Sequence, residues 1–130
     1  MRRLTPFVAL CLLSGCASSG GGDDTVGRKY VAFFTKGSAT LDRPAATVVS
    51  HAALVASRHP DRNLVVAGYA SAHGNLDADQ ALSAARADAV SAALQADGVA
   101  ASRITEHARP PANEDPGVAT RRVEIGFTSP

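Results

Sequence analysis

Two charged side chains fall where the sequence predicts an apolar helix face, and they are the first candidates for chemistry. The Ala-rich stretch that follows Asp77 has a helical period, and five of its apolar residues share one face: Leu82, Ala89, Val90, Ala93 and Leu94. Arg86 lies within the same arc. Asp79 has nearly the same bearing, because the separation of seven positions comes close to two helical turns. A guanidinium on such a face is costly unless its head reaches water or an anion.

Arg86 is predicted to lie near the start of this helix, on the side where the preceding loop emerges. The start of a helix offers unpaired backbone N–H groups and the positive end of the helix dipole, both of which favour an anion. One interpretation is therefore a pocket between loop and helix that receives a carboxylate. The other is that Arg86 extends to solvent or pairs with Asp79 as a structural ion pair, as is common on helix surfaces. Spacing alone favours neither.

The elements that must position these side chains alternate between strands and helices. Strands are predicted over residues 29–35, 64–67, 104–107 and 122–127, and helices over residues 42–58 and from the loop at 69–77 to residue 96. Asp42 is the expected N-cap of the first helix, and Gly98 is the stop of the second. Residues 109–117 are rich in proline and predict a loop. This order, closed by a hairpin-like pair of strands, predicts an α/β (α+β) two-layer sandwich.

Four sequence segments, in this order, resemble the OmpA C-terminal-like peptidoglycan-binding domain, a family that includes OmpA, MotB and Pal. They are Gly68 with Gly74, LSAARA at 82–87, DGV at 97–99 with Arg103 and Ile104, and RRVEI at 121–125. The resemblance extends over residues 30–127. It implies a β-α-β-α-β-β fold with the helices on one face of a mixed sheet.

The resemblance also implies a ligand. In the family, a loop Asp and a helix Arg clasp the zwitterionic end of diaminopimelate in the peptidoglycan stem peptide. The Arg binds the carboxylate and the Asp binds the ammonium, which is the chemistry of charge-assisted hydrogen bonds. By position the family Arg is Arg86, whereas the family Asp falls on Ser71.

Several other family positions are altered in this chain. The family Thr falls on Ala70, the family His on Tyr69, the Asn of the helix start on Asp79, and the Asn before Arg121 on Thr120. The ligand-binding set implied by the resemblance is Arg86, Ser71, Asp79, Tyr69, Ala70 and Arg121. Losing one hydrogen bond to a charged group costs about 1.5–3 kcal/mol. Two compensations are open: Ser71 accepts a hydrogen bond from the ammonium, or Asp79 supplies the missing charge.

The first residues read as a targeting segment. Arg2 and Arg3 precede an apolar run over residues 4–13, which is too short to span a bilayer. The LSGC that ends at Cys16 resembles the bacterial lipobox, so residues 1–15 are expected to be a lipoprotein signal peptide. Residues 16–28 are then a lipidated Cys16, carrying acyl chains such as palmitate, with a flexible tether, and residues 29–130 form the domain. The alternative is a plain secretory signal with an incidental cysteine.

By resemblance to lipoprotein sorting, the residue after the cysteine indicates the membrane. Ala17 stands there rather than Asp, which implies an outer-membrane anchor with the domain facing the periplasm. Cys11 would leave with the signal peptide, so no intrachain disulfide is expected in the mature chain.

Charge and composition argue against other function classes. The chain has 13 Lys and Arg, 12 Asp and Glu, and no Trp, which argues against a nucleic-acid partner. Its histidines show no compact metal-ligand grouping, and no cofactor is expected: His51, His59, His73 and His107. Ser71, His73 and Asp77 have the residue types of a hydrolase triad but lack the Gly-x-Ser-x-Gly elbow, so no enzyme is expected.

The resemblance therefore implies a non-catalytic lipoprotein that tethers the outer membrane to peptidoglycan through the diaminopimelate-containing stem peptide. The alternative is an OmpA-like lipoprotein that has lost peptidoglycan binding and serves as a protein–protein interaction module with an envelope partner. Ser71 and Ala70 favour the alternative, whereas Arg86 and Arg121 favour the first.

Overall fold

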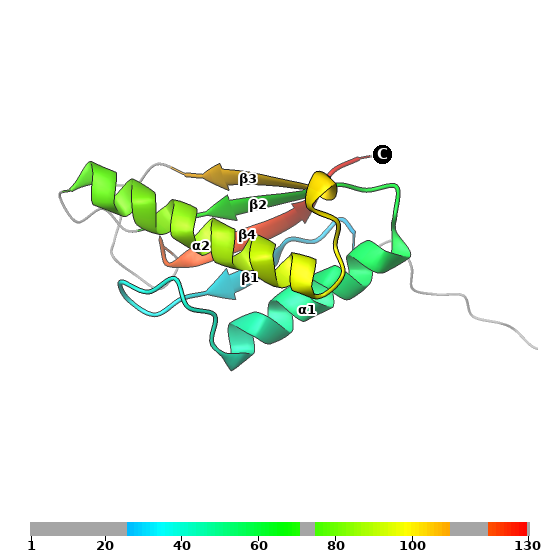
Figure 1. Cartoon of the computed structure of the whole chain (residues 1–130), viewed down its shortest axis with the longest axis horizontal. Coiled ribbons are helices and arrows are strands. Elements are labelled where there is room, and N and C mark those ends of the chain that lie inside the picture. The colour runs from blue at the N-terminus through cyan, green and yellow to red at the C-terminus, as the bar shows by residue number, and fades with distance from the viewer. Residues whose placement is uncertain (1–25, 71–74, 110–119, 130) are drawn as a thin grey trace, which may run out of the picture.

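The order of elements in the computed structural model is the predicted one. The structure describes residues 26–70, 75–109 and 120–129. The elements are β1 (Tyr30–Phe33), α1 (Arg43–Arg58), β2 (Leu64–Gly68), α2 (Leu76–Ala96), the short 3₁₀ helix η1 (Ala101–Arg103), β3 (Ile104–Ala108) and β4 (Arg122–Phe127). In Figure 1, α2 crosses over the sheet while α1 runs alongside β1. The fold is the mixed α+β sandwich expected from the sequence.

The four strands form one open sheet in the order β1-β4-β2-β3. β4 is antiparallel to both β1 and β2, and β2 is parallel to β3. The predicted hairpin-like closing pair is therefore wrong, because β4 does not lie beside β3 but between β1 and β2 (Figure 1). The physical reason lies in β4 itself. Val123 and Ile125 are completely buried, and a strand with such residues gains most at the centre of a sheet.

The core lies between the sheet and the two helices. Side chains from the strands and both helices pack there in one cluster that includes Val49, Leu64, Val66, Val90, Leu94, Val123 and Ile125. In α1 the buried residues follow the expected stripe, from Ala45 through Val49 and Ala52 to Ala56. Within the described parts of the chain, neither helix has the length and apolar run that a membrane crossing requires.

Both ends of α1 are capped by side chains. The Asp42 carboxylate accepts a hydrogen bond from the Ala45 N–H (2.9 Å), as the sequence predicted. At the other end, the Arg103 guanidinium donates to the carbonyl oxygens of Ala56 (3.1 Å) and His59 (2.8 Å). Arg103 also donates to the Arg62 carbonyl oxygen at 2.7 Å, so it ties the helix end to the turn that leads into β2.

The helix α2 begins earlier than predicted, at Leu76, because Asn75 caps it by accepting a hydrogen bond from the Ala78 N–H (3.1 Å). Its buried face is the expected one at Val90, Leu94, Arg86 and Asp79, which are all buried. It differs at Leu82, which is only partly buried, and at Ser83 and Ser91, which are buried polar residues.

The close approach of α2 to β2 explains the polar face of the helix. A side chain at Gly68 would overlap the main-chain carbonyl oxygen of Ser83 and press on Ala87. Small residues are therefore required where the strand and the helix touch. The larger Leu82 lies beside this contact and is only partly buried. The Ser83 hydroxyl remains satisfied, because it donates to the Gln80 carbonyl oxygen at 2.8 Å.

Candidate functional site

Arg86 is buried at the centre of the predicted site, with 1% of its surface exposed. Its Nε donates to the Ser38 carbonyl oxygen (2.8 Å), its Nη1 to that of Tyr69 (3.0 Å) and its Nη2 to that of Thr35 (3.3 Å). Neither sequence-based interpretation anticipated this arrangement. The head reaches neither bulk water nor the Asp79 carboxylate but three main-chain oxygens, which compensate the cost of burying the charge.

A tight turn presents two of these oxygens. Gly37 has a positive φ of 69°, and the Ser38 N–H donates to the Thr35 carbonyl oxygen at 3.1 Å. The turn leaves the Ser38 oxygen pointing toward α2 within reach of Arg86. Sequence analysis missed Thr35 and Ser38 as contacts of the arginine. The signal present in the sequence was Gly37, which only marked a turn.

A second guanidinium lies close to the first. Arg121 stands immediately before β4 and donates from its Nε to the Phe34 carbonyl oxygen at 3.2 Å. The Phe34 ring in turn packs 5.5 Å from the Arg86 guanidinium carbon. Burial lowers the pKa of Arg86, and the positive charge of Arg121 lowers it further. Arg86 nevertheless stays cationic, because arginine does not deprotonate in proteins.

The start of β4 brings these loops together. The Phe34 N–H donates to the Arg121 carbonyl oxygen (2.8 Å), and the Tyr69 N–H donates to that of Arg122 (2.9 Å). The carboxyl ends of β1 and β2 are therefore both hydrogen-bonded to residues 121 and 122 at the start of β4. The ion pairs among described residues join Lys29 and Arg122 to Glu124 and Arg62 to Asp61, and none includes Arg86 or Arg121.

The hydrogen-bonding capacity of Arg86 is only partly used. A guanidinium carries five N–H donors, and three of them bond to described residues. One N–H on each of Nη1 and Nη2 has no acceptor within residues 26–70, 75–109 and 120–129. The arrangement therefore places two positive charges close together, with the head of Arg86 buried among main-chain oxygens.

Tyr69 contributes to the site through its main chain. Its carbonyl oxygen accepts from Arg86, whereas its hydroxyl donates to the Glu124 carboxylate at 3.2 Å. Its ring packs 3.9 Å from the guanidinium carbon of Arg122. In β4, Arg122 and Glu124 alternate with the buried Val123 and therefore face away from the core. The Tyr69 side chain belongs to this outer cluster and not to the surroundings of Arg86.

The other predicted site residues divide into two groups. Ala70 is buried, and Asp79 is buried in the first turn of α2 with 6% of its surface exposed. Ser71 and Cys16 lie outside the described residues, as do Gly74 and His73. The clasp on an ammonium group and the lipidation therefore remain predictions. Within the described residues, no group of three or more His, Cys, Asp and Glu side chains is placed to hold a metal ion.

Comparison with known proteins supplies the family. The model of the OmpA family matches residues 33–122 of this chain. The "Probable lipoprotein YiaD" of Escherichia coli K12 is 37% identical over 99 residues, which are 71% of this chain and 45% of the relative. The chain thus spans less than half the length of that relative.

Solved structures share the fold. The peptidoglycan-associated lipoprotein of Burkholderia pseudomallei superposes with a TM-score of 0.67 at 21% identity, over 76% of this chain and 90% of that one. The OmpA-like domain of Francisella tularensis FopA1 gives 0.66 at 21% identity, over 75% and 69%. The periplasmic domain of Helicobacter pylori MotB gives 0.62 at 18% identity, over 75% and 70%. The family model covers more than half of the chain and the fold agrees with it, so the chain belongs to the OmpA family.

Proposed function

We propose that this protein is a non-catalytic envelope lipoprotein whose domain binds peptidoglycan through the diaminopimelate of the stem peptide. The observation that carries the proposal is the convergence of Arg86 and Arg121 at the carboxyl end of β1. Two neighbouring guanidinium groups repel each other, and a bound carboxylate relieves that repulsion. Family membership and the likeness to a peptidoglycan-associated lipoprotein support the same ligand.

The ammonium group of the ligand would be bound by Ser71 and Asp79. Ser71 follows Ala70 directly, and Asp79 lies in the first turn of the helix that holds Arg86. A hydroxyl oxygen at Ser71 accepts a hydrogen bond, and a carboxylate at Asp79 adds a charge. We propose these two as the replacement for the family acid.

The anchor belongs to the same proposal. Residues 1–15 would be removed as a signal peptide, Cys16 would carry the lipid, and residues 16–28 would tether the domain that follows. The relative YiaD is described as a probable lipoprotein, which supports this arrangement. With Ala17 after the cysteine, the protein would sit in the outer membrane with its domain in the periplasm and hold that membrane to the cell wall.

The first test leaves the protein unaltered, because Arg86 is internal and Arg86→Ala would disturb folding and binding together. The chain is incubated with insoluble peptidoglycan and then challenged with free diaminopimelate. We expect diaminopimelate to release the protein, because it offers the same carboxylate to the two guanidinium groups. The matched competitor is diaminopimelate with its carboxylates converted to amides, which should release none. Absence of binding, or equal release by both competitors, would contradict the proposal.

A gain-of-function variant tests the altered half of the clasp. Ser71→Asp restores the family acid and should tighten binding about tenfold to a hundredfold, the equivalent of one hydrogen bond to a charged group. Ser102→Asp is the matched control, because Ser102 is exposed in η1, which precedes β3 and so lies at the opposite end of the sheet. Asp79→Asn should weaken binding if Asp79 supplies the charge. Unchanged affinity of Ser71→Asp would point to another ligand.

The absence of an acid at position 71 favours a second candidate function, a lipid-anchored interaction module that no longer binds the wall. The same pull-down distinguishes the two. Protein that stays in the supernatant at every peptidoglycan concentration, while retaining its fold by circular dichroism, would support the interaction module.

A further inference from the structure

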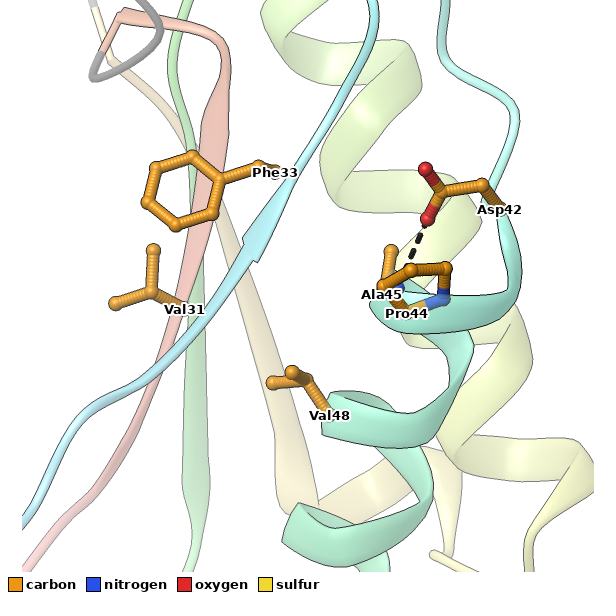
Figure 2. Close-up of a pocket in the computed structure, with 6 residues that line it drawn as sticks. All are labelled: Val31, Phe33, Asp42, Pro44, Ala45 and Val48. Atoms are coloured by element: carbon orange, nitrogen blue, oxygen red, sulfur yellow. Dashed lines mark hydrogen bonds between the residues drawn. The ribbon is translucent and has the colours of Figure 1, made fainter.

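A small apolar groove lies between the outermost strand and the first half of α1. Its volume is about 110 Å³, and it is lined by Val31, Phe33, Asp42, Pro44, Ala45 and Val48. Figure 2 shows Val48 pointing from α1 toward β1, and the Asp42 carboxylate turned to its own helix, where it bonds to Ala45. The polar group of the lining is thus already engaged. The groove has room for about one apolar side chain.

On the side away from β4, the main chain of β1 at Val31 and Phe33 has no hydrogen-bond partner among the described residues. β1 lies at the edge of the sheet, with β4 on one side only. In an antiparallel pair, only every second residue of a strand directs its N–H and C=O groups to the partner strand. The Phe34 N–H bonds to the Arg121 carbonyl oxygen, so Phe34 directs its groups to β4. By this alternation in the ladder of β1 and β4, the N–H and C=O groups of Val31 and Phe33 point away from β4, to the outer edge of the sheet. No main-chain hydrogen bond joins either residue to a described residue outside that ladder. Phe33 is also 47% exposed.

Charge distinguishes this edge from the rest of the chain. Residues 26–48 contain four exposed basic residues and one acid, Asp42, a net charge of 4 − 1 = +3, against +1 for the whole chain: Arg28, Lys29, Lys36 and Arg43. One of the four, Lys29, also meets the Glu124 carboxylate at 3.4 Å while 67% exposed. A second copy of the same edge would bring like charges together, which is unfavourable for pairing.

We propose that the free edge of β1 docks an extended, acidic segment of a partner protein as an added strand. Its backbone would pair with the N–H and C=O groups of Val31 and Phe33, and one apolar side chain would enter the groove. Acidic side chains flanking that segment would meet Arg43 and the other basic residues. This combination of edge hydrogen bonds, a side-chain pocket and complementary charge is how exposed sheet edges recognise peptides. The proposal does not depend on peptidoglycan binding.

The probe is a blocked peptide in which Val and Thr alternate between a pair of Glu residues at each end. The full chain is labelled with nitrogen-15, and its amide signals are followed by NMR during titration. We expect the largest shifts at Val31 and Phe33, and slower hydrogen exchange of these two amides in the complex. The matched peptide carries Lys in place of every Glu and should bind much more weakly, because it repels the basic edge.

A pair of charge reversals on one helix tests the role of the basic residues. Arg43→Glu should weaken binding of the Glu peptide about fivefold, the equivalent of one exposed ion pair. Arg58→Glu is the control, because Arg58 is exposed in the last turn of α1, roughly 22 Å along the helix from Arg43. Arg58→Glu should bind as the wild type does. Both variants should bind peptidoglycan as the wild type does, which separates this site from the one at Arg86.

The backbone contribution is tested at the strand edge. Val31→Pro removes one outward N–H, and proline is tolerated on edge strands, so the fold is expected to persist while peptide binding is lost. Retained amide signals of α2 and β3 in this variant verify the fold. The proposal is overturned if both peptides bind equally or if Val31 and Phe33 do not respond. It is also overturned if their protection rises with protein concentration without peptide, because the edge would then belong to a second copy.

Discussion

At the scale of single residues, the arginines act mainly on the main chain. Arg86 gathers carbonyl oxygens from the turn after β1 and from the loop after β2, and Arg103 gathers those at the end of α1. A planar guanidinium suits this role because its donors point in several fixed directions at once. Arg86 therefore joins two loops whatever ligand the site receives. A residue that matches a family binding position is at the same time a structural one.

Arg86→Lys is expected to destabilise the fold although the charge is kept. A compact ammonium cannot reach the Ser38, Tyr69 and Thr35 oxygens together, so at least one hydrogen bond of a charged group is lost. We expect the free energy of unfolding to fall by about 2–3 kcal/mol in urea titrations. Arg58→Lys, at an exposed position, should leave the urea midpoint unchanged. An unchanged midpoint for Arg86→Lys would mean that the carbonyl contacts add no stability.

At the scale of elements, the contact between β2 and α2 determines which face of the helix is buried. Gly68 lets the strand approach the helix backbone at Ser83. The neighbouring Ala87 has only a methyl side chain, so the two elements can lie close together. Apolar periodicity alone placed Leu82 inward. Close backbone packing leaves Leu82 only partly buried, because a leucine side chain does not fit between elements in such contact.

Gly68→Ala should lower the stability of the domain, since the added methyl group meets main-chain atoms that cannot rotate away. Overpacking of this kind costs about 1–3 kcal/mol, which would lower the melting temperature by several degrees. Gly126→Ala is the control on the same sheet, because a Cβ there meets no atom within 4 Å. Thermal unfolding followed by circular dichroism compares the two. Equal melting temperatures would show that β2 and α2 can separate slightly at no cost.

At the scale of the whole molecule, a polar cluster on the outer face of the sheet joins distant parts of the chain. The Glu124 carboxylate in β4 accepts three hydrogen bonds. They come from Lys29, which precedes β1, from Tyr69, which follows β2, and from Arg122 in the same strand. Burial alone would raise the pKa of Glu124. The hydrogen bond from Arg122, the charge of Lys29 and the hydrogen bond from Tyr69 outweigh burial and lower the pKa below its ordinary value of 4.5.

The lowered pKa predicts a pH dependence of stability. Because Glu124 holds its proton less tightly in the folded than in the unfolded chain, its contribution is fully present above pH 4.5 and is lost as the pH falls through the lower folded value. Urea titrations across this range should show a smaller acid-induced loss of unfolding free energy for Glu124→Gln than for the wild type.

Glu106→Gln is the contrasting variant. The pKa of Glu106 is raised, chiefly by its hydrogen bond with Asp88, so its contribution is present at low pH and lost as the pH rises. If the free energy of unfolding falls equally with acid for the wild type and Glu124→Gln, the lowered pKa of Glu124 is contradicted.

Much of the fold followed from local sequence patterns. The apolar stripe of α1, the N-cap at Asp42 and the alternation of β4 around Val123 each depend on neighbouring residues, and the structure confirms all three. The start of α2 was missed because Asn75 lies in a stretch that reads as a polar loop. The position of β4 was missed for a different reason. Its pairing with β1 and β2 involves strands that are remote in the chain, and local pattern carries no information on strand order.

The sequence by itself determined the family, the order of elements and the position of Arg86 on the buried face of α2. Only the tertiary structure decided what surrounds that arginine. Its partners are main-chain oxygens of residues 48, 51 and 17 positions away, and Arg121 reaches its neighbourhood only because β4 enters the sheet beside β1. The physical reason is that every residue carries the same carbonyl group. Which carbonyls remain unpaired, and where they point, depends on how the loops meet once the sheet has formed.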